Sequence, residues 1–140
     1  MNRKKNAEIL LFWLLSLSWG APMTLCGLVC GAVLLLCGVK PAVSNGFLCF
    51  SIGNAPGAFS LGPVLFLPTR AGRMLFRHEA GHGIQNILLG IFMPFVISLP
   101  SLIRFLWREA RIRRGEGRLL PPYESIWFES WATRLGSRFL

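Results

Sequence analysis

The sequence predicts a mainly α-helical membrane protein that forms a single domain over residues 1–140. Three observations support this fold class. Of the 140 residues, 53% are hydrophobic and only 15% are charged, whereas soluble domains contain about a quarter charged residues. A long uncharged stretch follows a short basic head. Lysine and arginine outnumber the acids by 15 to 6 and flank the apolar segments, a pattern that favours a lipid bilayer as partner and not a nucleic acid.

Residues 1–39 are expected to form an N-terminal transmembrane region. No charged residue lies between Ile9 and Val39, and one helix over this stretch would be roughly 46 Å long, against a hydrocarbon core of about 30 Å. Gly20-Ala21-Pro22 lies near the middle of the stretch, and proline is tolerated in the first turn of a helix but breaks its interior. We therefore expect an interfacial or re-entrant helix near 7–19 and a membrane span near 22–39, together an apolar helical hairpin.

Residues 46–67 predict a short β-hairpin. Two apolar or aromatic runs, 46–52 and 58–67, flank the turn signal Gly53-Asn54-Ala55-Pro56-Gly57. Gly62-Pro63 interrupts the second run, so that strand is expected at an edge of the sheet or with a bulge.

A helix is predicted next, opened by Pro68-Thr69 with Thr69 as its N-cap and ended at Gly90. The apolar segment 91–103 that follows contains Pro94 and Pro100, which predicts a broken or re-entrant segment.

Two further helices are predicted towards the end of the chain. Ser101 caps the first, over 102–114, which has apolar residues on one side and arginines on another, typical of a basic amphipathic helix at a membrane surface. After the linker 115–120 and two prolines, the last helix is expected from about Tyr123 to Leu135, with Gly136 as its stop.

The two histidines of the sequence form an HExxH motif, His78-Glu79-Ala80-Gly81-His82, on a predicted helix. A spacing of four residues puts both imidazoles on one face of the helix, where they can bind the same metal ion. In zinc sites of this kind the glutamate acts as general base on a metal-bound water. The motif predicts a zinc site with His78 and His82 as ligands and Glu79 as the base.

A catalytic zinc site needs a third protein ligand. The chain has no other histidine and no aspartate, so glutamates and the four cysteines are the candidates. Glu129 is favoured because aromatic residues surround it and no basic residue lies three or four positions away, so its desolvation requires a cation from elsewhere. Glu124, at the start of the last helix, and a cysteine stay open as alternatives.

Three polar residues are candidates for supporting roles. Gln85 lies three positions after His82 and therefore on the metal-facing side, where it can contact substrate or the second nitrogen of a ligand. Asn86 and Tyr123 are possible hydrogen-bond donors around the site or to substrate.

These residues also carry a resemblance to a known family. An HExxH helix followed by Glu129-x-Trp131-Ala132 resembles the gluzincin branch of zinc metallopeptidases, in which a glutamate on a later helix is the third ligand. More narrowly, segments 78–86, 99–102 and 127–136 resemble a family of small bacterial integral-membrane proteins regarded as zinc metallopeptidases. The resemblance covers about residues 58–136 and implies a metallopeptidase-like region over 40–140. Thr133 and Ala80 depart from the residues usual in that family, and neither is a ligand.

Together these features predict a membrane-embedded zinc metallopeptidase that binds one Zn²⁺ and hydrolyses a peptide or membrane-protein substrate. The basic segments 3–5, 70–77 and 104–118 place the head, the start of the motif helix and the tail on the cytoplasmic side of a bacterial inner membrane by the positive-inside rule. The alternative is a non-catalytic structural subunit of a membrane complex, with or without a structural metal.

Overall fold

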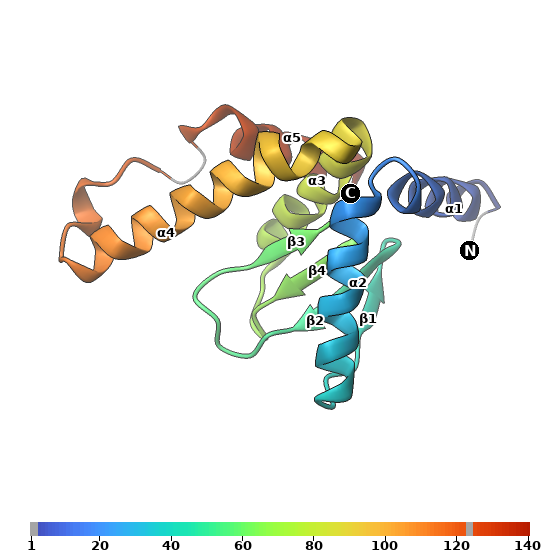
Figure 1. Ribbon diagram of the computed structural model, residues 1–140, viewed down its shortest axis with the longest axis horizontal. Helices are drawn as coiled ribbons and strands as arrows, with labels where there is room; N and C mark the ends of the chain where they lie inside the picture. The colour runs from blue at the N-terminus through green and yellow to red at the C-terminus, as the bar shows by residue number, and fades with distance from the viewer. Residues whose placement is uncertain (1–2, 123–124) are drawn as a thin grey trace.

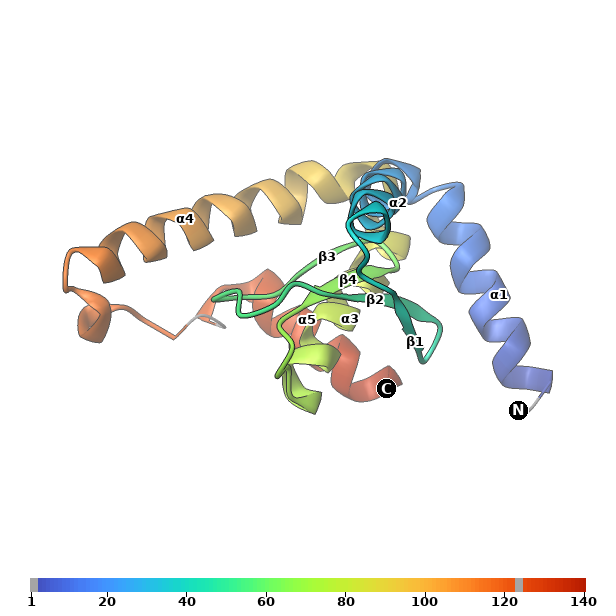
Figure 2. The same ribbon diagram turned by 90° about the horizontal axis from the view of Figure 1, so that it is seen from below.

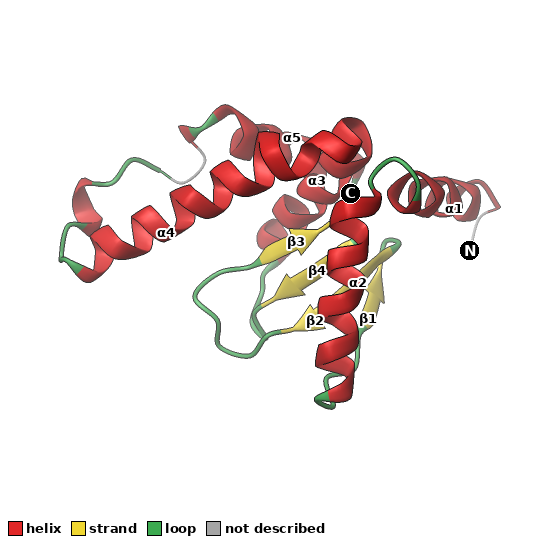
Figure 3. Ribbon diagram, in the orientation of Figure 1, coloured by secondary structure: helices red, strands yellow, loops and turns green. Residues whose placement is uncertain are grey.

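The computed structural model describes residues 3–122 and 125–140, and this part of the chain is mainly helical with a small sheet (Figure 3). The elements follow in the order α1 (Arg3–Leu17), α2 (Ala21–Leu36), β1 (Ala42–Ser44), β2 (Phe47–Ser51), β3 (Phe59–Leu61), β4 (Val64–Leu67), α3 (Arg73–Leu89), α4 (Leu99–Arg113) and α5 (Trp127–Phe139) (Figure 1). A 3₁₀ turn (η1, Gly90–Phe92) and a π-helical turn (η2, Pro94–Ser98) join α3 to α4, and a second 3₁₀ turn (η3, Gly117–Leu119) follows α4.

The sheet lies between two helical layers (Figure 2). Phe50, Val64 and Phe66 form the core on the α2 side, where Leu28 and Leu34 pack against them. On the other face, Phe47 and Leu65 pack against Ala80 of α3. Helix α5 lies beside α3 in that second layer, whereas α4 extends away from the body of the molecule (Figures 1 and 2).

The sheet has four strands in the order β1-β2-β4-β3, so the prediction of one hairpin over 46–67 is wrong. Strands β1 and β2 form one antiparallel hairpin, β3 and β4 form another, and β2 runs parallel to β4. The turns explain the difference. Asn45 and Gly46 take positive φ values of 50° and 87° and close the first hairpin, and Gly62 takes a φ of 61° and closes the second inside the run 58–67.

Two helix starts differ from the prediction. Helix α3 begins after Gly72, because Thr69 bonds to Ser51 and to the carbonyl of Gly53 instead of capping a helix. Helix α4 begins at Leu99, so Ser101 lies inside its first turn and does not cap it.

Two helix ends that were predicted at glycines behave differently. Helix α3 ends at Gly90 as predicted, with a φ of 56°. Helix α5 continues through Gly136 to Phe139. A Cβ atom on Gly136 would overlap the backbone of Arg77, so this glycine serves close helix packing and does not terminate the helix.

Within residues 3–122 and 125–140, no single helix is both long and apolar enough to cross a membrane. The segment predicted to span, 22–39, forms the shorter helix α2, because the chain turns at Gly38 (φ 87°) and enters β1. Two pairs of helical segments meet the criteria of length and composition only together: Arg3–Leu17 with Ala21–Leu36, bent by 99°, and Arg73–Phe92 with Pro94–Arg113, bent by 116°.

Candidate metal centre

Helices α3 and α5 bring together three side chains that can bind a metal ion. His78 and His82 lie on one face of α3, and Glu129 lies in the first turn of α5. One ligand atom from each residue lies within 4.8 Å of the other two, and all three side chains are buried or nearly so. These are the two histidines of the HExxH motif and the glutamate that the sequence favoured as the third ligand.

The spacing of the three ligand atoms fits one small cation. The Nε2 atom of His78 lies 3.1 Å from Oε2 of Glu129, and the Nε2 atom of His82 lies 3.2 Å from the same oxygen. Two ligands of a tetrahedral zinc ion, each about 2.0–2.1 Å from the metal, are roughly 3.3 Å apart. Both histidine–glutamate separations are therefore close to those found around such an ion.

Small residues allow α3 and α5 to approach closely enough for this arrangement. A Cβ atom on Gly81, between the two histidines, would overlap the carbonyl of Ala132, and one on Gly136 would overlap that of Arg77. Ala132 itself is fully buried. Because the two backbones are in direct contact at both places, Glu129 is held one turn from Ala132 and opposite the histidines.

Each histidine is oriented by a hydrogen bond from its second ring nitrogen. The Nδ1 atom of His82 lies 2.7 Å from Oε1 of Gln85, and the amide of Gln85 is fixed by donating to the carbonyl of Phe128 at 2.9 Å. The Nδ1 atom of His78 lies 2.8 Å from the hydroxyl of Thr133, which itself donates to the carbonyl of Glu129. Both partners therefore accept from Nδ1–H. In a neutral imidazole this leaves the Nε2 lone pair for a metal, as in metal-binding histidines, whereas Nε2–H of a protonated ring donates to Glu129.

Glu129 is fully buried and is also fixed by a partner. The hydroxyl of Ser101, from the first turn of α4, donates to its Oε1 atom at 2.6 Å. Burial alone would raise the pKa of the Glu129 carboxyl, but hydrogen bonds with His78, His82 and Ser101 outweigh it and hold the pKa well below its usual range. The carboxylate is therefore ionised and available to a cation.

Glu79 is buried beside the ligands but is not one of them. Desolvation raises the pKa of its carboxyl, although His82 and His78 act in the opposite direction, and the hydroxyl of Ser60 on β3 donates to it. For His82, burial would lower the pKa, but the hydrogen bond to Glu129 and the nearby Glu79 raise it overall. Because desolvation is the larger effect, the Glu79 carboxyl holds its proton more firmly than an exposed glutamate does.

The other predicted residues lie in different places. Asn86 points away from the ligands and donates to the carbonyl of Gly20 and to Thr24, so it joins α3 to the turn between α1 and α2. Three of the four cysteines are exposed at Cys26, Cys30 and Cys37, and Cys49 is half-buried on β2. Tyr123 and Glu124 lie outside the described residues.

Sequence reasoning missed three residues that shape the site. The sequence predicts Ser101 as a helix cap, Thr133 is noted there only as a departure from a family pattern, and Gly81 is given no role. For Ser101 and Thr133 no local pattern indicates the contact, since each reaches a ligand from another helix. The signal for Gly81 was present, because a glycine inside a helix needs a packing reason.

Comparison with protein-family models, with curated proteins and with solved structures gave no match to this chain.

Proposed function

We propose that this chain is a zinc-dependent peptide hydrolase, with His78, His82 and Glu129 as the zinc ligands and Glu79 as the general base. The convergence of three buried ligand atoms within 4.8 Å supports the metal site. Two imidazoles and one carboxylate are a donor set found in catalytic zinc sites, which keep one position open for water or substrate. The His78 and His82 side chains are 12% and 10% exposed, whereas Glu129 is fully buried.

Zinc bound there supplies Lewis acidity and lowers the pKa of a coordinated water to about 7. Glu79 would accept a proton from the attacking water while the oxygen of that water forms a bond with the peptide carbonyl carbon. As the C–N bond breaks, Glu79 returns that proton to the leaving amine. The hydrogen bond from Ser60 keeps the Glu79 carboxyl oriented towards this exchange.

The burial of Glu79 favours a hydrolase over the alternative, a subunit with a structural metal. A structural site needs the three ligands but has no use for a second carboxylate, and burying one without an ion pair costs free energy. Glu79 is 5% exposed, accepts a hydrogen bond from Ser60, and interacts electrostatically with the two histidines and, unfavourably, with Glu129. A role as general base accounts for this cost.

The test is the Glu79→Gln variant in detergent, loaded with zinc and offered a library of fluorogenic peptides. Metal content should stay at the wild-type level while hydrolysis falls at least a hundredfold, because general base catalysis contributes about 10² to 10⁴. Glu8→Gln, an exposed glutamate of α1, is the matched control and should leave both unchanged. Zinc binding by the wild type without hydrolysis, or an unchanged rate in Glu79→Gln, would favour the structural metal.

A further inference from the structure

Helix α2 packs small side chains against the sheet, beside Leu28 and Leu34, and exposes large apolar side chains on its opposite face. The face on the sheet contains Thr24, Gly27 and Gly31, and Cβ atoms on these glycines would overlap Leu61 and Phe50. The opposite face exposes Leu25, Val29, Val33 and Leu36, the last of them 90% exposed. A helix at a water-facing surface has the reverse arrangement, and a contiguous exposed apolar face indicates contact with an apolar partner.

A second exposed apolar face runs along α4. Leu99, Leu102, Ile103 and Leu106 are all more than half exposed and recur at the spacing of one helix face. Arg104 and Arg108 lie on the other side, where Arg104 donates to the carbonyl of Pro122 and Arg108 to that of Pro121. The tail therefore covers the basic side of α4 and leaves the apolar side open.

The two faces belong to one layer of the molecule. In Figure 2, α2 and α4 lie along the same edge, while Figure 1 shows that they run in different directions within that layer. Helices α1 and α3 approach the layer from the other side, and the chain then bends by 99° into α2 and by 116° into η2 and α4. Both bent pairs reach the layer and continue within it, and neither passes through it.

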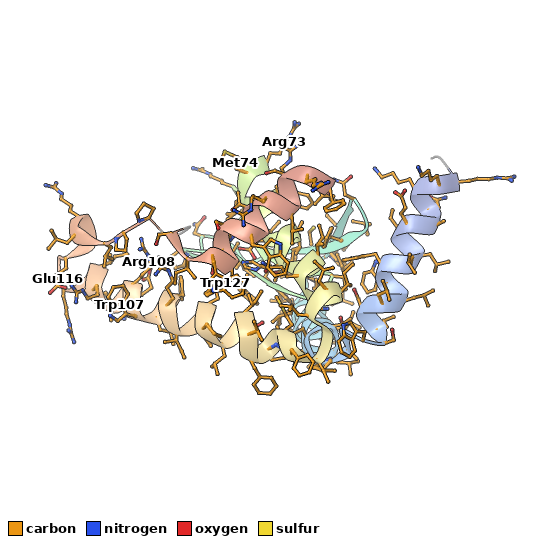
Figure 4. All side chains as sticks on the ribbon, turned by 90° about the horizontal axis from the view of Figure 1, so that it is seen from above. Arg73, Met74, Trp107, Arg108, Glu116 and Trp127 are labelled. Atoms are coloured by element: carbon orange, nitrogen blue, oxygen red, sulfur yellow. The ribbon has the colours of Figure 1, made fainter. Side chains whose placement is uncertain are left out.

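The basic residues at the starts of α1 and α3 lie on the side of the molecule away from this layer. Arg3, Lys4 and Lys5 begin α1, and Arg70, Arg73 and Arg77 surround the start of α3. Both helix starts lie on the side away from α2 and α4, as the N-terminus in Figure 2 and Arg73 in Figure 4 show. No charged residue lies in 9–39 or 87–103, which supply the layer. Apolar surface at one side and cations at the other match the cross-section of one anionic leaflet.

We propose that this layer, formed by α2, η1, η2 and the first half of α4, lies parallel to a bilayer and is inserted into one leaflet. Helix α2, with 16 residues, is about 24 Å long, shorter than the hydrocarbon core of about 30 Å, and its bends leave both ends at one depth. The basic helix starts then face the headgroups and water. His78 is five residues after the start of α3 and eleven before its apolar end at Leu89, so the three candidate ligands lie towards the aqueous side.

This inference does not depend on the proposed peptidase activity, and three native cysteines on α2 provide its test. Variants that retain only Cys26, Cys30 or Cys37, with the others replaced by alanine, are labelled with a fluorophore in vesicles of phosphatidylcholine and phosphatidylglycerol. Lipids with shallow or deep nitroxides then report the depth of each label. Since all three cysteines are exposed, the label does not disturb the core.

Insertion parallel to the membrane predicts equal depths for Cys26 and Cys37, within the acyl region of one leaflet. A helix along the membrane normal would separate these eleven positions by about 16 Å, and such a gradient would overturn the proposal. If no nitroxide quenches the labels and the chain sediments as a dimer, a second copy of the chain covers the layer. That result would also overturn the proposal. We expect the unlabelled wild type to float with the same vesicles, and more strongly than with vesicles of phosphatidylcholine alone. This control checks that membrane binding does not result from the cysteine substitutions.

Discussion

The contact between α3 and α5 and the layer of α2 and α4 distribute their side chains in opposite ways. Around the contact between α3 and α5 the chain buries Glu79, His82, Gln85 and Glu129. In the layer it exposes leucine, valine, isoleucine and phenylalanine side chains and buries glycine. A water-soluble domain of this size buries its apolar residues and exposes its charged ones.

The buried polar groups and the exposed apolar side chains have different physical explanations. Buried charged groups are tolerated where they are paired or bind a metal, and the three ligand atoms on α3 and α5 are arranged for one ion. Exposed apolar surface is stable where the solvent is itself apolar, as in a leaflet. Under the two proposals, the contact between α3 and α5 determines the chemistry and the layer of α2 and α4 determines the location.

The largest expected effect is on membrane binding. Replacing Leu102 and Leu106 together by glutamate puts two charges on the apolar face of α4. A charge in the membrane costs about 2.5–3.5 kcal/mol at the bilayer centre, so even at shallower depth we expect vesicle partitioning to fall at least about a hundredfold. Flotation with anionic vesicles measures it.

The matched control is the pair Met74→Glu and Phe139→Glu. Both side chains are exposed, Met74 to 84%, and Figure 4 places Met74 on the side away from α4. This variant should partition nearly as the wild type does. Equal losses in the two double variants would mean that hydrophobicity in general, and not this layer, determines binding.

The next effect is on the contact between α3 and α5. Gly81→Ala places a methyl group on the carbonyl of Ala132, so α5 must move and Glu129 moves with it. We expect the free energy of unfolding to fall by about 1–3 kcal/mol and the zinc affinity to fall with it. Gly72→Ala, in open space at the start of α3, is the control. If both variants unfold at the same denaturant concentration, the close packing at Gly81 does not position the ligands.

A smaller effect is expected from the serine that fixes Glu129. Ser101→Ala removes the 2.6 Å hydrogen bond to Oε1, and loss of a partner to a metal ligand costs about 10- to 100-fold in affinity. Competition with a zinc chelator gives the dissociation constant. Ser98→Ala, one turn earlier and bonded to Met23 and Met93, should bind zinc like the wild type. An unchanged dissociation constant in Ser101→Ala would show that α4 does not position the ligand.

Local patterns predicted much of this molecule. The break at Gly20-Ala21-Pro22 separates α1 from α2, and Gly90 ends α3. The candidate ligands could be selected from the HExxH spacing and from the aromatic surroundings of Glu129, because few alternatives existed in a chain with two histidines and no aspartate.

Features that depend on distant contacts were mispredicted. The parallel pairing of β2 with β4 has no local signature, although Asn45-Gly46 is a strong hairpin signal that indicates the turn before β2. The path of α5 through Gly136 depends on the backbone of Arg77 on another helix. In both cases the sequence shows the small residue, and only the packed structure shows which neighbour requires it.

The most direct test of the central claim is the metal content of the detergent-purified chain and of its His78→Ala and Glu129→Ala variants, with Glu116→Ala as the control on the exposed tail. We predict about one zinc per chain in the wild type and the control, and none above background in the two ligand variants. A wild type that binds no metal after zinc is supplied, or a Glu129→Ala variant that retains it, would contradict the site formed by α3 and α5.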